Sequence, residues 1–187
     1  LLVDPKSGKF KLYACGRLPN SRGKTSTADS KGGDDSEDPW CIFKFDDAAR
    51  PDQFVANTAR AVIVPPLGDS RAPSEIVGQY VRPAPVPEGY KDPVILFTAG
   101  QYHAYVIGVL RNSERTFHFT SADGAVWKPV GGYSHSILDL AGWHNFAVRP
   151  ASVVPLGVGY LFVYEGSDTR WPDPVYNIVT GLGFTFD

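Results

Sequence analysis

The sequence contains no methionine, only two cysteines and no long apolar run, and each absence narrows its interpretation. No stretch approaches the roughly 20 apolar residues that a membrane-spanning helix needs, so we expect no membrane partner. The 18 basic and 20 acidic residues give a net charge of −2 without a long basic run, which removes the electrostatic case for nucleic acid. Because the chain starts at Leu1 without methionine, we expect that its original N-terminus was removed or lies upstream.

The two cysteines, Cys15 and Cys41, have the spacing of neither a metal site nor a redox pair. The sequence is compatible with a disulfide between them and with two separate buried thiols, and we expect two buried thiols. A structural zinc site needs further soft ligands, so the sequence predicts no metal and no other cofactor.

Helical periodicity is also missing, since no window of eleven or more residues keeps the i, i+3, i+4 apolar spacing without interruption. Short segments rich in β-branched and aromatic residues alternate instead with glycine and proline. The segments that we expect as strands are residues 9–13, 61–64, 94–97, 102–107, 116–120, 152–154, 160–164 and 176–180. These features predict an all-β chain with a single domain over residues 1–187, interrupted by a long polar loop at residues 18–38.

One pattern occurs three times along the chain: a charged residue before a proline, a short apolar run, a glycine and a tyrosine. The copies run from Asp4-Pro5 through Gly8 to Tyr13, from Asp92-Pro93 through Gly100 to Tyr105, and from Arg149-Pro150 through Gly159 to Tyr164. Each glycine precedes its tyrosine by five residues, a spacing that suits two strands joined by a tight turn. Radial stacking of these hairpins predicts that Asp4, Asp92 and Arg149 converge on a common axis.

A turn signature follows the middle copy. Ser121 and Asp123 can hydrogen-bond the backbone of a turn, Gly124 can take a positive φ, and Trp127 can fold back to pack on the sheet. After the last copy, the sequence Thr185-Phe186-Asp187 matches the start of this signature, and there the chain stops. We therefore expect the 187 residues to be part of a longer protein or an abbreviated version of one.

This order of Asp-Pro, hairpin and Ser-x-Asp-Gly-x-x-Trp turn resembles the blades of the five-bladed β-propeller glycosidases. That superfamily includes arabinanases, xylosidases, invertases and β-mannoside phosphorylases. The resemblance implies a propeller of this type, with about three blades in this chain and therefore an incomplete ring. It also implies a carbohydrate partner and favours a secreted or periplasmic protein.

In those enzymes, acidic residues at the starts of the inner strands act on the glycosidic bond, and cleavage needs two carboxyl groups in different environments. The resemblance implies Asp92 and Asp4 as catalytic residues, with Glu165 as the candidate acid. Arg149 stands where many of these enzymes carry glutamate, and its guanidinium could bind the carboxylate of an acidic sugar or a phosphate. The residues that we expect to bind substrate are Arg149, Trp143, His144, Asn145, His103 and Asp168.

Several functions remain open. The first is a glycoside hydrolase that uses carboxylate acid/base catalysis, and a close variant is a phosphorylase that uses Arg149 for phosphate. A propeller that binds carbohydrate without cleaving it is the alternative, and Arg149 in place of a glutamate is the feature that favours it. A purely structural scaffold would need an exposed apolar patch. Each acidic candidate also has a structural interpretation, as a turn residue or an ion-pair partner.

Overall fold

The computed structural model describes residues 1–18, 39–66, 74–77, 80–83, 86–110, 113–133, 135–137, 142–168 and 178–185. The strands are β1 (Leu2–Val3), β2 (Phe10–Lys11), β3 (Tyr13–Arg17), β4 (Trp40–Lys44), β5 (Arg60–Ile63), β6 (Ser74–Val77), β7 (Tyr80–Pro83), β8 (Gly89–Thr98), β9 (Gln101–Leu110), β10 (Ser113–Ser121), β11 (Lys128–Pro129), β12 (Ala147–Pro155), β13 (Tyr160–Ser167) and β14 (Val179–Thr185). The helices of this described part are the short turns η1 (Ala56–Thr58) and η2 (Gly142–His144), and neither is long and apolar enough to cross a membrane. The all-β prediction is confirmed, while most of the loop expected at residues 18–38 lies outside the described residues.

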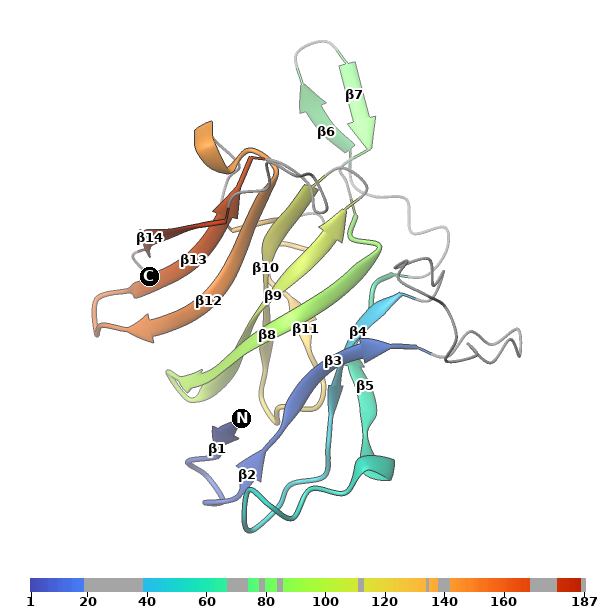
Figure 1. Cartoon of the computed structure of the whole chain (residues 1–187), viewed down its shortest axis with the longest axis vertical. Helices are drawn as coiled ribbons and strands as arrows, with labels where there is room; N and C mark the ends of the chain where they lie inside the picture. The colour runs from blue at the N-terminus through green and yellow to red at the C-terminus, as the bar shows by residue number, and fades with distance from the viewer. Residues whose placement is uncertain are drawn as a thin grey trace.

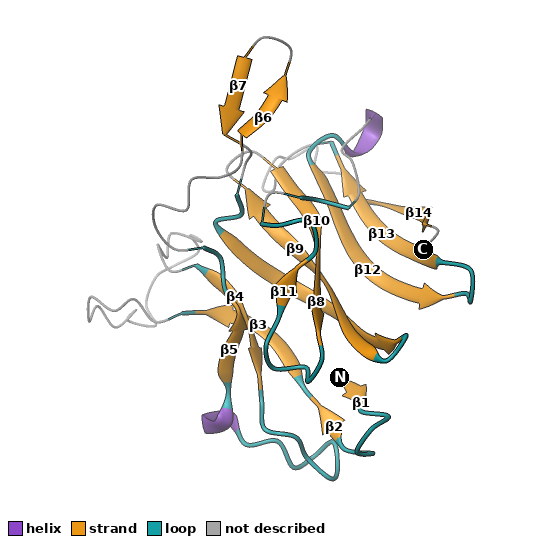
Figure 2. Ribbon diagram, turned by 180° about the vertical axis from the view of Figure 1, so that it is seen from behind, coloured by secondary structure: helices purple, strands orange, loops and turns teal. Residues whose placement is uncertain are grey.

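A seven-stranded sheet and a three-stranded sheet form the body of the molecule, and their strands group into three mainly antiparallel units that have the form of propeller blades (Figure 1). The first blade has the order β3-β4-β5, the second runs from β8 through β9 and β10 to β11, and the third runs from β12 through β13 to β14. The second and third blades are joined where β10 and β12 lie parallel, with Glu114 opposite Ala147. Two small hairpins complete the fold, and one of them, β6-β7, projects from the body in both views (Figures 1 and 2).

The three predicted hairpin glycines all have a positive φ: 69° at Gly8, 82° at Gly100 and 150° at Gly159. Glycine takes this backbone region at little steric cost, which explains its place in each turn. Gly100 lies between β8 and β9, and Gly159 lies between β12 and β13. The first copy differs, because only four residues lead from Asp4 to Gly8, against eight from Asp92 to Gly100. Asp4-Pro5 therefore lies in the β1-β2 turn and not on an inner strand of a blade.

The turn after β10 forms as the sequence predicts. The Asp123 carboxylate accepts hydrogen bonds from the backbone N–H groups of Ala125, at 2.8 Å, and Val126, at 2.9 Å. The Ser121 hydroxyl oxygen accepts the Gly124 N–H at 2.9 Å, and Gly124 has a φ of 73°. Trp127 is buried and lies edge-on to Tyr13 of the first blade, so the predicted packing role of this indole is confirmed.

Strand β9 is buried on both faces and separates two hydrophobic clusters. Its residues Tyr102, Ala104 and Val106 pack with first-blade residues such as Ile42. On the other face, Tyr105 packs with third-blade residues such as Phe162, with ring centroids 5.0 Å apart. This alternation follows from the two-residue period of a strand, and it places the second blade between the other two.

The cysteines form no disulfide. In the β3-β4 pair, Cys15 lies opposite Ile42 and Gly16 lies opposite Cys41. Directly opposite residues share a face of the sheet and consecutive residues do not, so the two thiols point to different faces and cannot be bridged. The expected burial is confirmed for Cys41, whereas Cys15 is half-buried.

Candidate functional site

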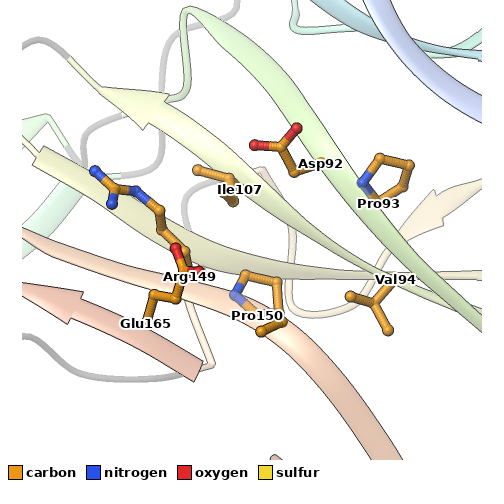
Figure 3. A pocket seen from close by; sticks show the side chains of 8 residues that line it. Asp92, Pro93, Val94, Ile107, Arg149, Pro150 and Glu165 are labelled. Carbon is orange, nitrogen blue, oxygen red and sulfur yellow. The ribbon is translucent and has the colours of Figure 1, made fainter. Parts of the chain in front are cut away.

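A pocket of about 330 Å³ lies where the first strands of the second and third blades approach each other. Figure 3 shows Asp92 projecting from β8 on one side, with Arg149 of β12 and Glu165 of β13 on the other. The remaining residues that line the pocket are Pro93, Val94, Ile107, Pro150 and Ala151. The structure thus brings two carboxyl groups and one guanidinium, from three strands, to one apolar-walled hollow.

Asp92 occupies a distorted part of β8. The pairing of β8 with β9 is irregular between Lys91 and Val94, and Asp92 has a φ of 48°. A positive φ is uncommon outside glycine, although aspartate and asparagine tolerate it better than most residues. The side chain is exposed, and the Cys15 thiol donates a hydrogen bond to its carboxylate at 3.4 Å. Local backbone strain of this kind clusters at functional sites.

Arg149 and Glu165 lie directly opposite each other in the antiparallel β12-β13 pair. Directly opposite residues share a face of the sheet, so both side chains reach the same pocket. A register shift follows immediately, between Pro150 and Ser152. Of the strands that line the pocket, β8 and β12 are therefore each irregular next to their charged residue.

Glu114 on β10 links Arg149 of the pocket to the neighbouring Lys91, and sequence reasoning missed it. Its carboxylate accepts a hydrogen bond from Arg149 Nε and forms an ion pair with Lys91 Nζ at 2.8 Å. Burial by itself raises the pKa of Glu114, but the hydrogen bonds from Lys91 and Arg149 outweigh it, so the pKa is lowered overall. Glu114 therefore stays ionised and orients both cations. Its role depends on the long-range pairing of β10 with β12, for which no local sequence signal exists.

Asp4 does not line this pocket. It is only 4% exposed, and its carboxylate accepts hydrogen bonds from the Tyr102 hydroxyl at 2.5 Å and the Ser7 hydroxyl at 2.6 Å. The backbone N–H of Lys6 donates to it as well, and Lys11 Nζ lies 3.5 Å away. Burial raises the pKa of Asp4, but these hydrogen bonds and Lys11 have the larger effect. The pKa is therefore lowered overall, and the carboxylate is held ionised. Its partners are those of a structural ion pair.

Trp143, His144, Asn145 and Asp168 also lie outside the pocket lining. Trp143 is 44% exposed and stacks on Tyr164 of β13, with ring centroids 6.2 Å apart. His144 Nδ1 lies 3.4 Å from the Tyr164 hydroxyl. Trp143 and His144 of η2 thus form a separate aromatic group with Tyr164 of β13. Asn145 and Asp168 are exposed.

His103 lies elsewhere again, in a second pocket with His118 of β10. Its Nδ1 atom is 3.0 Å from His118 Nε2, so the two imidazoles share a hydrogen bond. Burial, with a smaller contribution from His103, lowers the pKa of His118 to about 4. No group of three or more His, Cys, Asp or Glu side chains is placed to hold a metal ion within the described ranges.

The low pKa of His118 predicts that stability falls as the pH falls. The folded protein protonates this imidazole near pH 4 and an unfolded chain does so near pH 6.5, so acid favours the unfolded state within that window. We expect a loss of about 2 kcal/mol in the free energy of unfolding between about pH 8 and about pH 5. The measurement is urea unfolding across that range, compared with His118→Phe, which keeps a ring against Tyr105 but does not titrate. An equal pH slope in both proteins would contradict this assignment.

Comparisons with known proteins bear on the fold. No protein-family model and no curated protein matches the sequence. Among solved structures, the GH32 beta-fructofuranosidase of Bombyx mori matches with a TM-score of 0.51 and 14% sequence identity, over 96% of this chain and 34% of that chain. A mutant of the same enzyme in complex with sucrose matches with a TM-score of 0.47 and 14% identity, over 94% of this chain and 31% of that chain.

The chain therefore spans about a third of the length of these structures, at 34% and 31%. A likeness at this level of identity carries the architecture and not the activity. The order of the strands and the likeness to the solved enzyme agree on the same architecture. The chain has an all-β fold of the β-propeller type, with three blades present.

Proposed function

We propose that the pocket of Asp92, Arg149 and Glu165 binds carbohydrate and that the protein cleaves a glycosidic bond there by carboxylate acid/base catalysis. The observation that carries the proposal is the meeting of two carboxyl groups, from different blades, in one pocket of a glycosidase-type fold. Glycosidic cleavage needs one carboxylate to activate water or attack the sugar and one carboxylic acid to protonate the leaving oxygen.

The two carboxyl groups occupy different surroundings, as this chemistry requires. Asp92 is exposed, which suits the ionised partner that activates water or attacks the sugar, while Glu165 is half-buried in β13, which suits the proton donor. Arg149, held by Glu114 through Nε, would bind substrate oxygens from the wall between them. Asp4 has no part in this proposal, because its carboxylate is engaged away from the pocket.

A non-catalytic carbohydrate-binding propeller is the second candidate. The observation that favours it is Arg149 at the start of the third blade, where the resemblance implies a glutamate. A glycoside phosphorylase that uses Arg149 for phosphate is a variant of the first candidate, since the cluster of Lys91, Arg149 and Glu114 contains two cations and one anion.

The test is a turnover and thermal-shift screen of the full-length protein against aryl glycosides and oligosaccharides, with and without phosphate. Phosphate-independent release of a sugar would establish a hydrolase, and phosphate-dependent release a phosphorylase. The configuration of the released sugar then distinguishes retention from inversion. Stabilisation by a sugar without turnover would move the protein to the binding class. If no sugar is cleaved and no sugar stabilises the protein, the proposed carbohydrate function of this pocket is contradicted.

A further inference from the structure

A second pocket of about 300 Å³ lies between the second and third blades and shares no lining residue with the first. It is lined by His103, Tyr105, His118, Ile137, Tyr160, Phe162, Phe184 and Thr185. Tyr105, Tyr160 and Phe162 are buried, whereas Phe184 is 45% exposed and Thr185 is exposed. The pocket therefore has a buried aromatic floor and an accessible rim on β14, and its volume is at the lower end of small-molecule sites.

The geometry of its histidine pair fixes the chemistry of one wall. The ring centroids of His103 and His118 are 5.2 Å apart and the planes differ by 15°, while the facing nitrogens are 3.0 Å apart. Most of the centroid separation is thus taken up by the N···N distance, so the rings meet edge to edge. The nitrogens point at each other and not at a common third point, which suits a shared proton and does not suit a metal ion.

A hydrogen-bonded imidazole pair of this kind is adaptable. Either ring can donate the shared proton, and a shift of tautomer reverses which outer nitrogen carries hydrogen. His118 also lies flat on Tyr105, with centroids 4.5 Å apart and planes 14° apart, which holds the pair in place. The pair is consequently a polar edge, held in place, in a pocket whose other lining residues are mainly aromatic.

The lining favours a neutral ligand over a charged one, because it contains no Asp, Glu, Lys or Arg among its described residues. A buried charge without a partner would be costly. The lining instead combines aromatic rings, which suit the apolar side of a sugar ring, with side chains that carry hydroxyl or imidazole groups, among them Thr185 on the exposed rim. We propose that this pocket is a binding site for the ring of a neutral sugar, separate from the Asp92 pocket and independent of the function proposed for it.

The experiment uses the full-length protein carrying Asp92→Asn and Glu165→Gln, so that the first pocket is impaired and any turnover is suppressed. Saturation-transfer NMR is recorded with the neutral probes glucose, fructose, galactose and their methyl glycosides. We expect at least one probe to bind, and Phe184→Ala to weaken it at least fivefold. The matched control is Leu182→Ala, an exposed apolar residue of the same strand, 70% exposed and outside the lining, which should leave binding unchanged.

Thr185→Val, which keeps the size of the side chain and removes its hydroxyl, decides the question if Phe184→Ala does not fold. Three results would overturn the proposal: no neutral probe binds, glucuronate or phenol binds more tightly than every neutral sugar, or both rim variants bind like the parent. Retained binding in the parent double variant and loss in a rim variant would separate this site from the Asp92 pocket whatever the catalytic screen shows.

Discussion

Replacing Asp92 by asparagine is expected to lower kcat/KM at least about 100-fold on any substrate that the protein cleaves, with little change in stability. Loss of a positioned acid or base typically costs 10²–10⁴-fold in rate. Asparagine keeps the size of the side chain and tolerates the positive φ of 48° at this position, so the backbone of β8 is preserved. Steady-state kinetics and a urea unfolding curve on the same preparation check both halves of the expectation.

The matched control for this substitution is Asp52→Asn. Asp52 forms an exposed ion pair with Arg50 at 2.7 Å, remote from the pocket lining, and neither turnover nor stability should change measurably. Wild-type turnover in Asp92→Asn would exclude Asp92 from the chemistry. A loss of turnover with an equally large loss of stability would show instead that Asp92 serves the backbone of β8.

The second large effect concerns Asp4 and has the opposite signature: Asp4→Asn should destabilise the protein by about 3 kcal/mol and leave the kcat of the folded molecules unchanged. Removing one partner of a buried ion pair leaves the other charge in the interior with less compensation, which costs more than the pair contributed. Here that charge is Lys11, whose side chain is 6% exposed and which also contacts Asp47 at 2.5 Å. Because Asp47 still neutralises Lys11 in the variant, the expected loss of stability lies at the lower end of the roughly 3–5 kcal/mol that breaking a buried ion pair costs.

Urea unfolding midpoints of Asp4→Asn and Asp52→Asn, at equal m-values, give the comparison. A stability loss in Asp4→Asn that matches the exposed control would contradict the buried ion pair. An active-site role for Asp4, which the repeat pattern and the family resemblance both suggest, would instead appear as lost turnover in a protein of unchanged stability.

Much of the architecture could be predicted from local sequence, because turns and strands depend on neighbouring residues. The glycine-to-tyrosine spacing places Gly100 and Gly159 in hairpin turns, and the Ser121-to-Trp127 signature forms the expected hydrogen bonds. The β6-β7 hairpin is absent from the predicted strands, although Ile76-Val77 and Tyr80-Val81 are residue types that strands favour.

The site was only partly predictable, since its geometry depends on pairings far apart in the sequence. Asp92 and Arg149 meet because equivalent positions of adjacent blades converge, which the repeat pattern predicts, and Glu165 joins them because it lies opposite Arg149 in the β12-β13 pair. Asp4 shares the Asp-Pro signature but lacks the residues to form an inner strand before its glycine. Glu114 and the His103-His118 pair have no local signature, because their partners are reached only through strand register.

The Glu114 carboxylate has a mechanical consequence. Its two oxygens hold Lys91 of β8, in the same blade, and Arg149 of β12, in the next one, so the contact with Arg149 spans the seam at which the second and third blades join. A rotation of one blade against the other therefore stretches the Glu114–Arg149 ion pair. The separation of Asp92 and Glu165 is thus held by contacts within the protein, and a ligand of the proposed site would meet a pocket whose width is already fixed.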